Sequence, residues 1–120
     1  MDKTILIVED NDQDRKILER TLRQAGYQSL FFASSGEEGI EKAKAGAPVL
    51  IILDINLPAM SGSEAHNLLK QSPSTRNIPI IFNTGLMRPG EDAGDGANQS
   101  IVAKTNDANY LIKKVKEMIG

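Results

Sequence analysis

Acidic residues follow two apolar runs of this sequence, and a threonine and a lysine follow two others. Glu9 and Asp10 come just after TILIV, and Asp54 comes directly after VLIIL. Thr84 lies just beyond IPIIFN, and Lys104 comes directly after SIVA. A carboxylate in such a position can serve as a turn or cap residue, bind a metal ion or act as a nucleophile. The choice among these roles depends on whether the fold brings the five side chains together.

If the five side chains meet, their types suit phosphoryl transfer. Three neighbouring carboxylates repel one another, and a hard divalent cation with oxygen ligands compensates that repulsion. Mg²⁺ typically takes one or two carboxylates, for which Asp10 and Asp54 are the candidates. The backbone carbonyl of Asn56 is a candidate third ligand, and Glu9 is expected to act through water. A threonine hydroxyl and a lysine ammonium would stabilise charge on the phosphoryl oxygens, and a carboxylate can itself be phosphorylated.

Apolar runs alternate with amphipathic segments along the chain, which predicts how these residues are positioned. The expected strands are Thr4–Val8, Gln28–Ala33, Val49–Leu53, Ile78–Asn83 and Ser100–Ala103. The expected helices lie in Asp12–Gly26, Ser35–Gly46, Ser63–Gln71 and Asp107–Ile119. This alternation predicts an α/β fold with a parallel sheet and helices on both of its faces. Ligands bind beyond the carboxyl ends of such strands, so the acids, the threonine and the lysine should converge at one edge.

Three details of the pattern make sharper predictions. Val49–Leu53 shows no alternation, which indicates an interior strand that is buried on both faces. Helical spacing turns Ile17 and Leu68 inward, and it turns the single histidine, His66, toward solvent. The segment Gly85–Gly96 contains four glycines and a proline, so a fourth helix there should be short, frayed or absent.

The composition limits the class of protein. With 120 residues, 40% hydrophobic and 25% charged, the chain can form one globular domain with a real core. A net charge of −2 provides no electrostatic footprint for nucleic acid and no polybasic membrane anchor. The absence of cysteine excludes disulfides and zinc thiolate sites, and no apolar run reaches the ~18 residues of a membrane span. We therefore expect a cytoplasmic domain that binds neither nucleic acid nor membrane.

Four motifs carry a resemblance to a known family. VEDN (Val8–Asn11) places two acids after the first strand, and DINLPAMSG (Asp54–Gly62) matches the pattern D-x-x-L-P-x-M-x-G. Thr84 is followed by the small residue Gly85, and Lys104 follows the fifth strand. Together these motifs resemble the receiver domain of two-component response regulators, in the CheY-like superfamily. The resemblance covers essentially the whole chain, so residues 1–120 are expected to form a single receiver domain.

The resemblance implies a fold and a function. The fold is a flavodoxin-like (βα)5 doubly wound sheet of five parallel strands in the order 2-1-3-4-5. Asp54 would accept a phosphoryl group from a histidine kinase or a histidine phosphotransfer protein. Glu9, Asp10, Asp54 and the Asn56 carbonyl would form the Mg²⁺ site. The chain would act on no other substrate, so self-phosphorylation and autodephosphorylation would be its only reactions.

The same resemblance implies a switch. Thr84 and Lys104 would bind the phosphoryl oxygens, and phosphorylation would alter an output face made of the fourth helix, fifth strand and fifth helix. That face would control an unknown downstream protein or a fused effector. The sequence departs from the family pattern in three places: Thr105 replaces the usual proline after the lysine, Ile101 replaces the usual aromatic residue, and the glycine-rich segment Gly85–Gly96 replaces an ordinary fourth helix. The alternative is therefore a degenerate receiver that acts as a constitutive protein-binding module.

An enzyme is the third alternative. Phosphatases of the haloacid dehalogenase type also use a nucleophilic aspartate, a threonine or serine, and a lysine. They need a second aspartate two residues after the nucleophile as the general acid. Here that position is Asn56, which cannot transfer a proton in that way, so the sequence favours a phosphorylated switch over a phosphatase.

Overall fold

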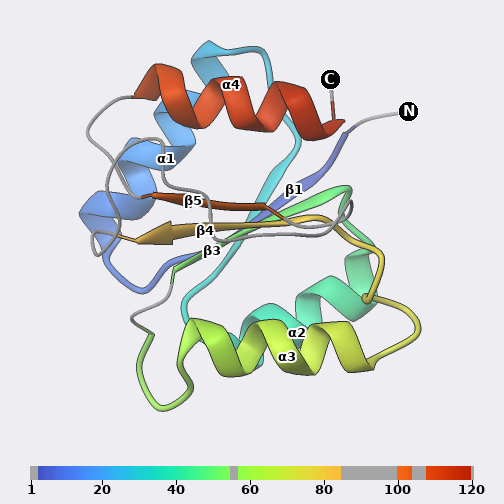
Figure 1. The fold of residues 1–120 in the computed structure, drawn as a ribbon. Helices are drawn as coiled ribbons and strands as arrows, with labels where there is room; N and C mark the ends of the chain where they lie inside the picture. Colours follow the sequence, from blue (N-terminus) through green and yellow to red (C-terminus); the bar gives the residue numbers. More distant parts are fainter. Residues whose placement is uncertain (1–2, 55–56, 85–99, 104–107, 120) are drawn as a thin grey trace.

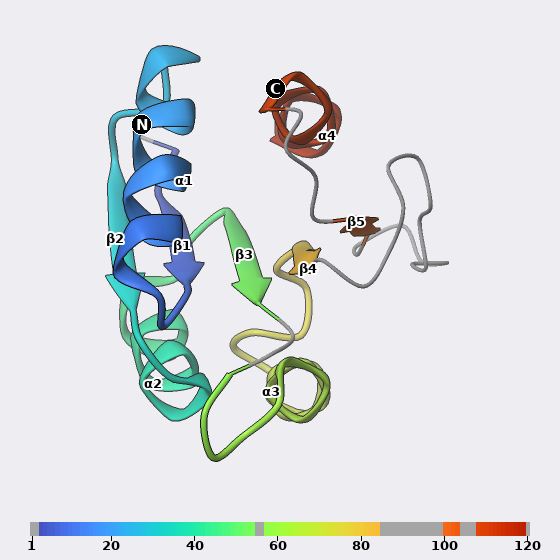
Figure 2. The ribbon, with the colours of Figure 1, turned by 90° about the vertical axis from the view of Figure 1, so that its left-hand side faces the viewer.

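The sheet of this protein has five parallel strands. The computed structural model describes residues 3–54, 57–84, 100–103 and 108–119. The strands are β1 (Ile5–Val8), β2 (Leu30–Ala33), β3 (Leu50–Asp54), β4 (Ile80–Thr84) and β5 (Ser100–Ala103). Their order across the sheet is β2-β1-β3-β4-β5, which confirms the predicted doubly wound topology (Figure 2).

Helices cover both faces of the sheet. They are α1 (Asp12–Gln24), α2 (Gly36–Gly46), α3 (Gly62–Gln71) and α4 (Ala108–Ile119). Figure 1 shows α1 and α4 on one face and α2 and α3 on the other. The predicted irregularity of a fourth crossover helix falls on residues 85–99, outside the described residues, so α4 is the helix that closes the chain. None of the helices in the described ranges is long and apolar enough to cross a membrane.

Local capping signals explain where three helices begin. The side chains of Asn11, Ser35 and Ser61 each accept a hydrogen bond from the backbone amide three residues later. Such caps satisfy amides of the first turn, which have no partner within the helix. The helix α2 ends at Gly46, the last residue of the predicted helix, and is closed by Ala47 in the left-handed conformation, at φ 44°.

The core consists of two layers, one on each face of the sheet. Along β3, Leu50 and Ile52 pack toward α1 and α4, whereas Ile51 and Leu53 pack toward α2 and α3. Each of these four side chains is at most 1% exposed. This confirms that the run without alternation forms an interior strand. It also means that the strand ending in Asp54 is held firmly on both faces.

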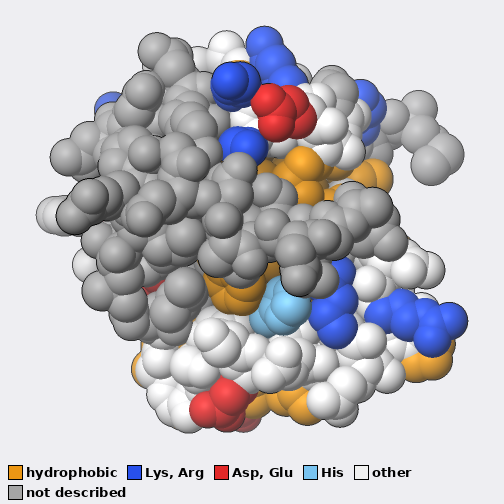
Figure 3. Space-filling view, in the orientation of Figure 1, with side chains coloured by type: hydrophobic (Ala, Val, Ile, Leu, Met, Phe, Trp, Pro, Cys, Tyr) orange, Lys and Arg blue, Asp and Glu red, His pale blue; other side chains and the backbone are white. Residues whose placement is uncertain are grey.

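Two expectations about helix faces are wrong, and a third holds only in part. Ile17 is 58% exposed and Leu68 is 42% exposed, although both were expected to point inward. His66 is half-buried: it reaches the surface (Figure 3), and the centroid of its ring also lies 5.2 Å from that of Phe82. The residues of α3 that face the sheet are Gly62, Ala65 and Leu69. His66 and Leu68 lie on opposite sides of this buried face, and His66 is on the side that contacts Phe82 of β4.

Candidate functional site

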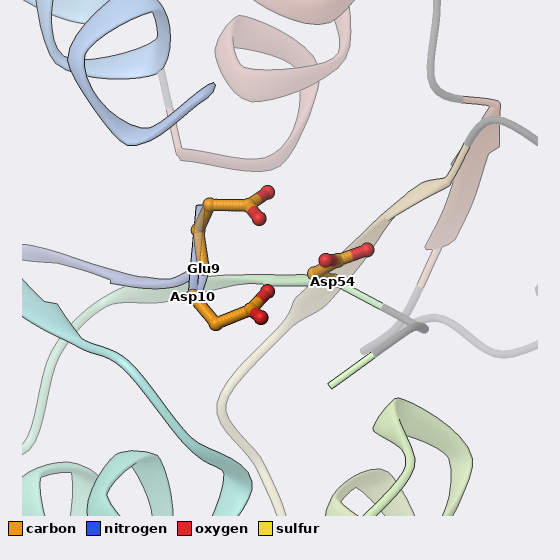
Figure 4. A group of neighbouring side chains, drawn as sticks. All are labelled: Glu9, Asp10 and Asp54. Atoms are coloured by element: carbon orange, nitrogen blue, oxygen red, sulfur yellow. The ribbon is translucent and has the colours of Figure 1, made fainter. Parts of the chain in front are cut away.

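Three carboxylates predicted to meet do lie together. Oxygen atoms of Glu9, Asp10 and Asp54 are all within 4.8 Å of one another. Figure 4 shows Glu9 and Asp10 extending from the end of β1 toward Asp54 at the end of β3. Glu9 is 1% exposed and Asp54 is 7% exposed, whereas Asp10 is open to solvent. The site is thus an acidic centre with one face accessible from outside.

Strand pairing brings the acids to the same edge. In the β1–β3 ladder, Val8 lies opposite Leu53, so the residues that follow Val8 are beside Asp54. The amide of Glu9 donates to the carbonyl of Ala33 at 3.0 Å, which extends the ladder to β2 by one residue. These backbone contacts fix where β1 ends relative to its two neighbours.

The start of α1 holds the first acid from the other side. The amide of Asn11 donates to Oε2 of Glu9 at 3.3 Å. The Asn11 side chain in turn accepts from the amide of Asp14 at 2.9 Å and caps α1. Glu9 is therefore fixed between the last residue of a strand and the first turn of a helix.

A glycine behind the site allows close packing of a helix against β1. A Cβ atom on Gly39 would lie 2.8 Å from Cγ2 of Val8, which is closer than real contacts allow. The helix α2 therefore packs directly on the residue before Glu9. Gly39 was not among the residues predicted to build the site, although a glycine within a helical pattern costs about 1 kcal/mol and is a signal of close packing.

The loop after Asp54 is anchored to α2. The amide of Met60 donates to the carbonyl of Pro58 at 2.6 Å, around Ala59 at φ 64°. A Cβ atom on Gly36 would lie 3.1 Å from Sδ of Met60, so this side chain packs tightly on the first residue of α2. This contact ties the segment that follows the central acid to the same helix that supports β1.

The remaining predicted residues are placed only in part. Thr84 is the last residue of β4, where it lies opposite Ala103 of β5 and one position beyond the pair Asp54–Asn83. The backbone at Thr84 is thus at the same sheet edge as the acids. The predicted roles of Asn56 and Lys104 concern residues outside the described ranges.

The side chains at this edge suit a hard divalent cation. Oxygen ligands are what Mg²⁺ prefers, and positive charge between three carboxylates within 4.8 Å of one another would offset their mutual repulsion. The acid–cation combination also suits phosphoryl groups, whose oxygens share the metal. The cluster is therefore consistent with a metal site for phosphoryl chemistry.

Comparison with known proteins agrees with this fold. The response regulator receiver domain family matches residues 5–116 of the chain. The polar-differentiation response regulator DivK of Brucella ovis is 30% identical over 122 residues, covering 100% of this chain and 98% of DivK.

Two solved structures from other bacteria show a similar fold. One is the receiver domain of the sensor histidine kinase PA1611 from Pseudomonas aeruginosa PAO1, with a magnesium ion coordinated in its active site cleft. It is 26% identical, with a TM-score of 0.84, and the match covers 100% of this chain and 99% of that one. The other is the signal receiver domain of a signal transduction histidine kinase from Syntrophus aciditrophicus. It is 31% identical, with a TM-score of 0.82, and the match covers 98% of this chain and 89% of that one. The chain belongs to the response regulator receiver domain family.

Proposed function

We propose that this receiver domain is a phosphorylation-dependent signalling switch whose phosphoacceptor is Asp54. The observation that carries the proposal is the position of Asp54 in the acidic centre. It ends the buried central strand β3, with the two acids that follow β1 on one side and β4 on the other. Glu9 is 1% exposed and is held by the start of α1, which makes it a poor nucleophile.

The reaction assigned to Asp54 is the transfer of one phosphoryl group from a histidine side chain to the free carboxylate of Asp54. A carboxylate oxygen of Asp54 attacks the phosphorus of a phosphohistidine on a histidine kinase or phosphotransfer protein. The P–N bond breaks, and the imidazole leaves with the electron pair and takes up a proton. The product is an acyl phosphate on Asp54. Hydrolysis of the acyl phosphate returns the Asp54 carboxylate and inorganic phosphate, and this resets the switch.

Magnesium is the cation that we assign to the site. Asp10 and Asp54 are the direct carboxylate ligands in this assignment, with the carbonyl of Asn56 as a third ligand and Glu9 acting through water. When bound, the ion offsets the negative charge of the carboxylates and of the incoming phosphoryl oxygens. The magnesium ion in the cleft of the Pseudomonas aeruginosa receiver domain supports this choice.

Thr84 and Lys104 are assigned to the phosphoryl oxygens. A threonine hydroxyl and a lysine ammonium at the ends of β4 and β5 can donate hydrogen bonds to that group. Binding of Thr84 to the phosphoryl group would shift the equilibrium of the chain after β4 and the face formed with β5 and α4. A downstream protein or a fused effector that prefers one of the two states would read the signal.

The proposal is tested by chemical phosphorylation with a small donor. We expect incubation with phosphoramidate and Mg²⁺ to add the mass of one phosphoryl group to the intact protein. Asp54→Asn should abolish the adduct, whereas Asp12→Asn should leave it unchanged, because Asp12 is an exposed acid on α1 that pairs with Arg15. A folded wild-type protein that forms no adduct would instead favour a constitutive binding module.

A further inference from the structure

The strand β2 is at one end of the sheet order, and one of its sides faces outward (Figure 2). The carbonyls of Ser29 and Ala33 accept hydrogen bonds from the amides of Ile5 and Glu9, so these residues face β1. Successive residues of an extended strand direct their backbone groups to opposite sides. The amides and carbonyls of the even-numbered residues therefore face outward: Gln28, Leu30, Phe32 and Ser34.

Two charged side chains of α2 cover outward groups at the carboxyl end of β2. Nζ of Lys42 donates to the carbonyl of Phe32. Oε1 of Glu38 accepts from the amide of Ser34 at 2.8 Å and from its hydroxyl at 3.0 Å. Lys42 and Glu38 also form an ion pair at 3.1 Å, so each holds the other over the edge.

A third charged side chain covers the amino end of β2 from the opposite face of the sheet. NH1 of Arg23 on α1 donates to the carbonyl of Gln28 at 2.8 Å. The Gln28 side chain returns a hydrogen bond to the carbonyl of Arg23 at 2.9 Å. Arg23 is further oriented by Glu19, at 3.0 Å. Helices from both layers therefore contribute to the same strand edge.

Between the covered ends lie the outward groups of Leu30 and the amide of Phe32, on an apolar, half-buried strand. Such an edge is a template for pairing with another strand, and charged residues are one way in which proteins block it. We propose that Arg23, Glu38 and Lys42 form an edge guard that closes β2 to strand addition. The strand that it excludes is β2 of a second copy of this chain.

The geometry of a dimer that forms through two unguarded β2 edges follows from symmetry. Two copies that pair through the same edge have a two-fold axis, so their β2 strands run antiparallel. The covered groups lie at the two ends of β2, where an antiparallel partner would place its own ends. Exposed ion pairs contribute little to stability, so the guard acts by occupying the backbone groups and by placing charge over them.

The test is to remove the guard from α2 and measure association. We expect wild-type protein to sediment with the mass of one chain. Glu38→Ala combined with Lys42→Ala should approach twice that mass as concentration rises. Amide exchange at Leu30 and Phe32 should slow over the same concentration range, because those amides would then donate to the partner strand.

Two control variants separate the guard from its side effects. Ser35→Ala removes the cap of α2, which accepts from the amide of Glu38 at 3.1 Å, but keeps the edge contacts. Glu41→Ala combined with Lys44→Ala removes two exposed charges of the same helix. Both controls should remain single chains.

Three outcomes would overturn the proposal. The first is a guard variant that is folded and stays a single chain, and the second is equal association by Ser35→Ala. The third is association that leaves exchange at Leu30 and Phe32 unchanged. If the double variant does not fold, the single variant Lys42→Ala decides the question, because it frees the carbonyl of Phe32. The proposal requires this variant to associate and to slow amide exchange at Leu30 and Phe32.

Discussion

Oxygen atoms of Glu9 and Asp54 lie within 4.8 Å of each other although both side chains are almost fully buried. If both carboxylates are ionised, their charges in this buried setting would repel more strongly than they would at the surface. Strand pairing and helix capping hold Glu9 in place, and the two core layers hold β3. A cation bound between the two carboxylates would relieve that repulsion.

The first prediction concerns that cation. Mg²⁺ should stabilise the folded protein by about 2.7 kcal/mol at a free concentration one hundred times its Kd, because it binds the folded state only. Thermal unfolding with and without Mg²⁺ measures this shift. Asp10→Asn should reduce the shift strongly, whereas Asp12→Asn should retain it. Equal shifts in both variants would mean that the ion binds elsewhere.

A second prediction concerns the close approach of α2 to β1. Gly39→Ala should lower the free energy of unfolding by roughly 1–2 kcal/mol, because the steric cost against Val8 exceeds the helix propensity that alanine gains. Val8→Ala makes room for the new methyl group, so the two changes together should cost less than the sum of their separate costs. Urea unfolding of the four proteins in this cycle gives the interaction energy. Additive costs would show that the two residues do not compete for space.

A third prediction concerns the end of α2. Ala47 closes the helix at φ 44°, with its amide donating to the carbonyl of Ala43. Since glycine adopts this conformation without the Cβ penalty, Ala47→Gly should raise the free energy of unfolding by up to about 1 kcal/mol. Ala45→Gly, within the same helix, should lower it by about 1 kcal/mol. Chemical denaturation of both variants checks the opposite signs, and a loss in both would refute the argument.

A fourth prediction is a pH dependence. The hydrogen bond from the Ser34 amide, followed by that from Lys42, lowers the pKa of Glu38 below its ordinary value of 4.5. A lowered pKa in the folded state means that ionised Glu38 stabilises the fold above the unfolded pKa. This contribution is lost as the pH falls through the folded value. The free energies of unfolding of wild type and Glu38→Gln should therefore converge as the pH falls through the pKa of Glu38 in the folded state. A constant difference across pH 3–7 would contradict this linkage.

Patterns that depend only on burial could be predicted from the sequence. Leu50–Leu53 lack alternation because both faces of β3 are covered, and this marks the strand that ends in Asp54. Parallel strands end at one edge, so the meeting of Asp54 with the acids after β1 also follows. The order of the strands came from the family resemblance, since alternation alone leaves several topologies open.

Details that depend on the rotation of a helix or on distant partners could not be predicted. Ile17 and Leu68 lie at the border of their helix faces, and the sequence pattern does not say on which side the sheet lies. His66 packs on Phe82 because the small residues beside it bring α3 close to the sheet. The contact between Lys42 and the Phe32 carbonyl joins two elements that the pattern describes separately.

Mapping the phosphorylated residue tests the central claim most directly. Borohydride reduces an acyl phosphate to an alcohol, which converts a phosphorylated aspartate to homoserine. After treatment with phosphoramidate and Mg²⁺ and then borohydride, peptide mass spectrometry should find homoserine at position 54 alone. Asp10 and Glu9 should be unchanged, and protein without the donor should show no conversion. Conversion at Asp10 or Glu9 with Asp54 intact would contradict the assignment of Asp54 as the phosphoacceptor.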